Sequence, residues 1–161
     1  MTQAAAALIL LFSTYSAFAA ENAWDVLERF GLTGVWSASC AKPATPKSFR
    51  TIFAKGADRQ AIREIDYGAG FPIRLTIVES AQMISPLKLR IRVRNTDPNW
   101  GPTNNVVHEA VLIKENNAQE VVRIRVIESI LNDGTVLVQD GILKSIGKPG
   151  FWDYKCRSAM S

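Results

Sequence analysis

The stretch GLTGVWSASC, residues 31–40, decides how the rest of the chain is interpreted. It follows a short amphipathic segment, contains strand-like residues, and ends on Cys40, one of only two cysteines. We expect it to form the first strand of a β-barrel. The other cysteine, Cys156, lies close to the end of the chain. A bond between the two would tie the first strand to the tail and enclose everything between them.

Beyond residue 40 the chain alternates between strand-like segments and turns. Leu89, Ile91 and Val93 alternate with basic residues, which is the period of two expected of a strand with one solvated face. The sequence NDG at 132–134 is a strong hairpin signal. Patterns of this kind predict eight main strands, at 31–40, 49–55, 60–67, 74–80, 88–94, 106–114, 120–129 and 135–144, and a last short segment at 151–156.

Helix is expected only at the start of this domain. Asn22 can cap a helix that ends at Gly31 and would lie across one end of the barrel. Its apolar face would be Ala23, Trp24, Leu27 and Phe30. The fold class is therefore all-β, an eight-stranded antiparallel up-and-down barrel with a short N-terminal helix. A two-sheet sandwich is the alternative.

Residues 1–19 resemble a signal peptide, since an uncharged apolar run ends in Ala17-Phe18-Ala19. Residues 20–161 would then form a single domain, located in the periplasm or secreted, with no membrane span after cleavage. A retained membrane anchor is the alternative, but the apolar run is short and interrupted by polar residues. Export favours a disulfide between Cys40 and Cys156 over two buried free thiols.

The charge balance indicates a mildly basic protein, with 19 basic and 15 acidic residues and a net charge of +4. In an exported protein this favours anionic surfaces or partners and not nucleic acid. Two strands carry a stripe of arginines that could bind phosphate or carboxylate: Arg90, Arg92, Arg94, Arg123 and Arg125. A solvated outer face is the alternative. Trp100, on a proline-containing loop, is a second candidate for contact with a ligand or partner.

No pattern in the sequence predicts catalysis. His108 is the only histidine, and its neighbour Glu109 would point to the opposite face of a strand, so we expect His108 to have no catalytic role. The chain contains no glycine-rich phosphate loop, no nucleophile elbow and no paired metal-ligand spacing. We therefore expect a protein that is not an enzyme and uses no cofactor or metal.

A short helix followed by Gly34-Val35-Trp36 in the first of about eight strands, with a disulfide to the tail, resembles the lipocalin or wider calycin pattern. The resemblance implies a lipocalin-like barrel in which Trp36 packs against a basic side chain near the last strand. Arg157 and Lys144 are the candidates. The same outline resembles small periplasmic barrels that inhibit secreted metalloproteases.

Two classes of function follow, and we expect a monomer in either case. One is a binding barrel for a small apolar or anionic ligand. The other is a protein-binding module, such as a protease inhibitor or a protein that interacts with another envelope protein. An eight-stranded barrel leaves an interior that is either filled by side chains or able to hold one small ligand, so a hollow near Ile91, Val93, Ile124 and Val126 would favour the first class. A filled interior would direct attention to Trp100 and Trp24.

Overall fold

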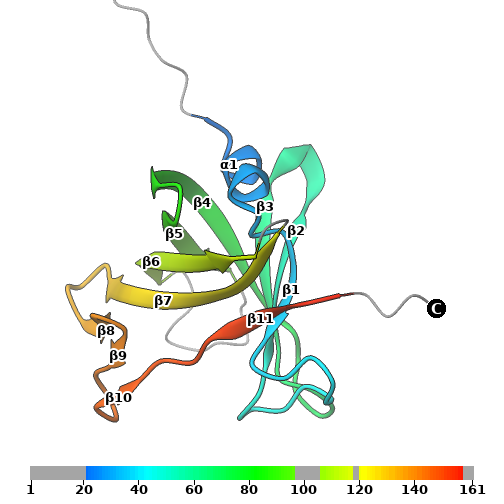
Figure 1. Cartoon of the computed structure of the whole chain (residues 1–161). Helices are drawn as coiled ribbons and strands as arrows, with labels where there is room; N and C mark the ends of the chain where they lie inside the picture. The colour runs from blue at the N-terminus through cyan, green and yellow to red at the C-terminus, as the bar shows by residue number, and fades with distance from the viewer. Residues whose placement is uncertain (1–20, 97–105, 118–119, 158–161) are drawn as a thin grey trace, which may run out of the picture.

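One antiparallel sheet forms the body of the protein and closes on itself where β6 pairs with β7. The computed structural model describes residues 21–96, 106–117 and 120–157. Its elements are α1 (Ala23–Phe30), β1 (Gly34–Ser37), β2 (Arg50–Lys55), η1 (Ala57–Arg59), β3 (Ala61–Asp66), β4 (Arg74–Ser85), β5 (Lys88–Asn95), β6 (Val107–Asn116), β7 (Val121–Leu131), β8 (Val136–Gln139), β9 (Ile142–Leu143), β10 (Lys148–Pro149) and β11 (Asp153–Cys156). The strands β1 to β7 and β11 make a closed barrel (Figure 1). The predicted eight-stranded antiparallel barrel is confirmed, and the alternative of two separate sheets does not form.

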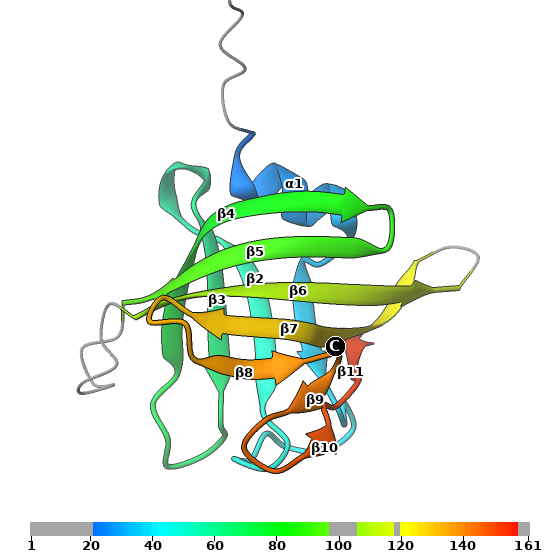
Figure 2. The same cartoon turned by 90° about the vertical axis from the view of Figure 1, so that its left-hand side faces the viewer.

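The strand that completes the barrel differs from the expected one. Residues 135–144 do not form a single barrel strand, because Asp140 and Gly141 both adopt positive φ and divide the segment into β8 and β9. Together with β10 they form a small extension of the sheet, in which β8 pairs with the second half of β7 (Figure 2). The last short segment supplies the eighth strand instead, since β11 pairs with β1 on one side and with the first half of β7 on the other.

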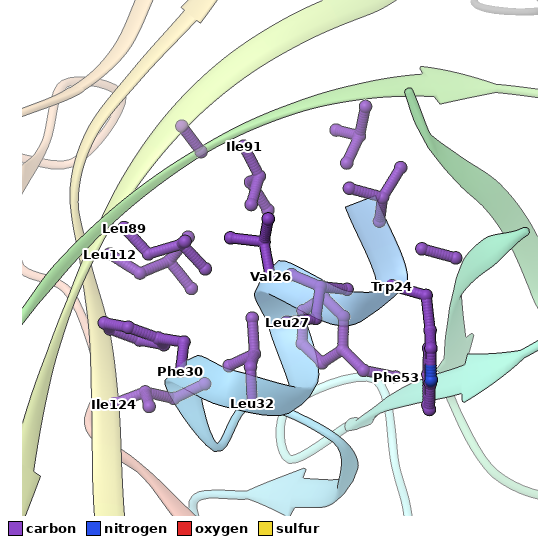
Figure 3. Close-up of a cluster of buried hydrophobic side chains, with 14 of the residues drawn as sticks. Trp24, Val26, Leu27, Phe30, Leu32, Phe53, Leu89, Ile91, Leu112 and Ile124 are labelled. Atoms are coloured by element: carbon purple, nitrogen blue, oxygen red, sulfur yellow. The ribbon is translucent and has the colours of Figure 1, made fainter. Parts of the chain in front are cut away.

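The helix α1 closes one end of the barrel, as the sequence predicts. Asn22 Oδ1 accepts a hydrogen bond from Trp24 N at 2.8 Å, and Gly31 ends the helix with a φ of 82°. A side chain at Gly31 would also meet Val121 Cγ2 at 2.7 Å, so both backbone and space favour glycine there. Figure 3 shows Val26 and Phe30 pointing from the helix into the barrel.

The buried core lies at this closed end. Side chains of α1 pack against aliphatic and aromatic residues on the inner faces of the strands, among them Phe53, Leu89, Leu112 and Ile124 (Figure 3). The predicted alternation in β5 is confirmed, because Leu89, Ile91 and Val93 are buried while Lys88, Arg90 and Arg92 are exposed. The end of the barrel that α1 closes, here called the plugged end, is therefore a packed hydrophobic core.

The predicted disulfide between Cys40 and Cys156 is present, with a Cα–Cα distance of 5.3 Å. It links the segment after β1 to the end of β11, and the two strands are also hydrogen-bonded neighbours. The bond encloses a sequence separation of 116 residues. The barrel is therefore closed both by backbone pairing and by a covalent link.

Candidate functional site

Trp36 fills the closed end from β1 and is buried. Its Nε1 donates a hydrogen bond to Leu32 O at 2.7 Å, and Lys155 Nζ lies 5.5 Å from the ring centroid. The basic partner is thus Lys155 and not Arg157 or Lys144, because Lys155 stands directly opposite Trp36 in the pairing of β1 with β11. Trp24 is also buried, so neither tryptophan presents a surface for a partner.

Three of the predicted arginines lie on the outer face of β5. Arg92 pairs with Glu79 on β4 at 3.1 Å and with Glu109 on β6 at 3.2 Å, and Arg94 also pairs with Glu79. Arg90 is exposed on the same face. Much of the charge of this stripe is therefore offset by neighbouring carboxylates.

The other two arginines lie on β7, with β6 between them and β5. Arg123 and Arg125 both stack on Trp152, with guanidinium carbons 4.5 Å and 5.2 Å from its ring centroid. Arg123 also pairs with Glu115 at 2.6 Å. The five arginines thus form two separate groups, and no single anion site joins them. Trp100 lies outside the described residues.

A hollow of about 320 Å³ occupies the end of the barrel opposite α1. It is here called the open-end hollow. Its walls come from several strands and from the segments at that end: Ala38, Lys47, Ser48, Phe49, Arg63, His108, Ala110, Val126, Ser129, Leu137, Val138, Leu143, Gly150, Phe151 and Asp153. A second hollow of about 190 Å³ adjoins it, shares Arg63, Val126 and Asp153, and extends toward Ile91 and Ile124. The larger volume is at the lower end of the range for small-molecule sites.

The hollow exists because the inner face changes composition along each strand. On β6 the inward positions run from Leu112 at the plugged end through Ala110 to His108. On β7 they run from Ile124 through Val126 to Ser129. Smaller and more polar side chains therefore replace the aliphatic ones with distance from α1, and the helix does not reach far enough to fill the space.

Arg63 is the enclosed cation of the open-end hollow, whereas Lys47 in the same walls is exposed. It lies on β3, and its Nε donates a hydrogen bond of 3.0 Å to Thr76 Oγ1, which in turn donates to Arg63 O at 2.9 Å. Burial lowers the pKa of Arg63 to about 10, so the guanidinium stays charged at neutral pH. Among the described residues no carboxylate forms an ion pair with it. An enclosed guanidinium whose charge no carboxylate offsets is a site that an anion would stabilise.

Two further titratable groups line the same space. Burial, with a smaller contribution from the charge of Arg63, lowers the pKa of His108 to about 4, so the imidazole is neutral at physiological pH. Burial raises the pKa of Asp153 to about 6. The hollow therefore offers the enclosed guanidinium of Arg63, the exposed ammonium of Lys47 at its mouth, one neutral ring and one carboxyl that takes up a proton in mildly acidic solution, within walls that are otherwise largely apolar.

Neither Arg63 nor Asp153 was predicted from the sequence as a site residue. Arg63 is flanked by Ile62 and Glu64, so the alternation in this strand does not reveal which face is inside. His108 could have been placed inside, since it shares the period of Ala110 and Leu112.

Comparison of the chain with protein-family models, with curated proteins and with solved structures finds no match. Within the described ranges, no helix combines the length and apolar character needed to cross a membrane. The same residues hold no group of three or more His, Cys, Asp or Glu side chains arranged to bind a metal ion. Fold and geometry together define a closed antiparallel barrel with one plugged end and one hollow end that contains an enclosed arginine.

Proposed function

We propose that this protein is a non-catalytic binding barrel for a small amphipathic anion, which it holds in the open-end hollow. The observation that carries the proposal is Arg63, a charged side chain enclosed in an apolar space with no carboxylate partner among the described residues. The anionic group of the ligand would accept hydrogen bonds from this guanidinium. Its apolar part would lie against Val126, Leu137 and Phe151.

The proposed position of the anion site rests on a comparison of Arg63 with the arginines of the outer surface. Arg92, Arg94 and Arg123 already pair with carboxylates on the outer surface, where water and salt weaken any further interaction. Arg63 stands in a partly enclosed space, where an electrostatic interaction is stronger. An outer-face role for the arginine stripe remains a prediction, but the interior cation is the better anion site.

The disulfide between Cys40 and Cys156 fits a protein that is exported to an oxidising compartment. We propose the periplasm or the exterior of the cell as its location. A soluble barrel with an enclosed site there would carry or sequester an amphipathic molecule that is poorly soluble on its own.

Isothermal titration calorimetry with octanoate and with 1-octanol tests the proposal, because the two probes share an apolar chain and differ in charge. We expect octanoate to bind more tightly. Arg63→Met should weaken octanoate binding by about ten- to a hundredfold, the range for a charge-assisted hydrogen bond, and should remove the preference over octanol. Arg90→Met is the matched control, since it removes an exposed arginine on the outer face.

Three results would contradict the proposal. The first is that neither probe binds the wild-type protein. The second is that the two probes bind it equally well. The third is that Arg63→Met retains the preference for octanoate. A circular dichroism melt of each variant would show that the fold is preserved.

A further inference from the structure

Three segments meet at the open end of the barrel and form its rim. They are residues 38–49 between β1 and β2, residues 67–73 between β3 and β4, and residues 141–151 in the extension. Figures 1 and 2 both place these segments at the bottom of the molecule, at the end opposite α1. Because antiparallel strands reverse direction at each turn, these connections lie at the same end.

The rim exposes large hydrophobic side chains. Phe71 and Ile73 are each 53% exposed, Ile146 is 58% exposed and Phe151 is 64% exposed. They are the four most exposed large hydrophobic residues of the described part of the chain. Exposed apolar residues gathered in one region mark an interaction surface more often than the same residues scattered singly.

The rim is also cationic. It carries four exposed lysines, Lys42, Lys47, Lys144 and Lys148. The three segments contain no aspartate or glutamate. Among the described residues none of the four lysines forms an ion pair, whereas at the opposite end Glu21 pairs with Arg29 and Asp25 pairs with Arg59. Basic residues occur at both ends of the barrel, but within the described ranges only at the end with α1 do acidic side chains offset some of them.

We propose that the rim binds the surface of an anionic lipid bilayer. Lysines near such a surface are attracted by its negative potential, and aromatic and aliphatic side chains beside them enter the headgroup boundary. A carboxylate in the rim would oppose this attraction, and none is present in the three segments. Lys47 and Phe151 line both the rim and the open-end hollow, so the docked barrel would direct its hollow toward the lipid. Membrane binding by the rim does not depend on the proposed ligand function.

Co-sedimentation of the protein with vesicles tests the inference. We compare vesicles of phosphatidylcholine alone with vesicles that contain phosphatidylglycerol, and no soluble ligand is present. The double variant Lys144→Gln with Lys148→Gln removes two rim charges. Its matched control is Lys55→Gln with Lys88→Gln, which removes two exposed lysines at the plugged end.

A second pair of variants tests the apolar contribution. Ile146→Ser with Phe151→Ser removes two exposed hydrophobic side chains of the rim. Ile84→Ser with Leu87→Ser removes two at the plugged end, one near the end of β4 and one in the β4–β5 turn. Both pairs alter exposed positions, which keeps the effect on folding small.

We expect binding to anionic vesicles that weakens with added salt. The rim lysine variant should lose about 25-fold in affinity, at about fivefold per lysine, and its control should stay close to wild type. The rim serine variant should also bind more weakly than its control.

No binding to anionic vesicles, equal binding to both kinds of vesicle, or equal losses in rim and control variants would overturn the inference. Arg63→Met should leave vesicle binding unchanged while it weakens octanoate binding. The two proposals can therefore fail separately.

Discussion

Asp153 and His108 should oppose each other in the pH dependence of stability. The pKa of Asp153 is raised from 3.8 to about 6, so between these values the folded protein binds a proton that the unfolded chain has lost. The free energy of unfolding therefore falls as pH rises through this window. The pKa of His108 is lowered from 6.5 to about 4, so here the unfolded chain binds the extra proton. Its contribution to the free energy of unfolding rises with pH.

The two effects are similar in size. The difference between 3.8 and about 6 for Asp153 corresponds to about 3 kcal/mol, and that between 6.5 and about 4 for His108 also to about 3 kcal/mol. In the wild-type protein these contributions nearly cancel between pH 4 and pH 6.5. A variant that lacks one of the two groups should therefore show the pH dependence of the free energy of unfolding that the other group causes.

Urea unfolding at a series of pH values between 4 and 7 measures both slopes. Relative to wild type, His108→Gln should lose about 3 kcal/mol of stability between pH 4 and pH 6.5, and Asp153→Asn should gain about 3 kcal/mol over the same interval. Glu128→Gln, on the exposed outer face of β7, is the control. Profiles of both variants that run parallel to that of wild type would refute the reasoning, because they would mean that neither group is buried in the hollow as described.

Replacing both cysteines with serine should lower the free energy of unfolding by about 5 kcal/mol, because Cys40 and Cys156 enclose a separation of 116 residues. A loss below about 1 kcal/mol in urea unfolding would contradict the role of the bond in closing the barrel. Leu27→Ala should cost about 2 to 5 kcal/mol in the same assay because Leu27 is buried in the plug, whereas Glu28→Ala on the exposed side of α1 should cost much less. Equal losses for these two variants would contradict the plugged end. The mass of the intact exported protein should show the loss of residues 1–19, and a secreted chain that retains them would refute cleavage at that site.

Local patterns in the sequence predict most strands of the barrel and its helix, because these patterns depend on residues close together in the chain. The alternation of Leu89, Ile91 and Val93 with basic residues defines an inner and an outer face without knowledge of neighbouring strands. Asn22 and Gly31 mark the two ends of α1 by the chemistry of helix termini.

The closing strand could not be predicted in the same way. Residues 135–144 are longer and more strand-like than residues 151–156, but the turn at Asp140 and Gly141 diverts the longer segment into the extension. β11 is part of the barrel because it pairs with β1 and β7, two strands that are distant from it in the sequence. Such long-range pairing leaves little local signal.

The candidate site was missed for a related reason. Arg63 lies inside because β3 pairs with β4 in a register that sets it opposite Thr76. The sequence of β3 alone favours an outer position for a charged residue, as the alternation in β5 does for its arginines. A cation enclosed in a barrel becomes visible only when the register of several strands is known.

A crystal structure of the protein with octanoate tests the central claim most directly. We predict that the carboxylate lies within hydrogen-bond distance of the Arg63 guanidinium and that the chain runs along Val126 toward Phe151. Octanoate bound instead on the outer face, beside Arg92 or Arg123, or an open-end hollow that stays free of it at saturating concentration, would contradict the account.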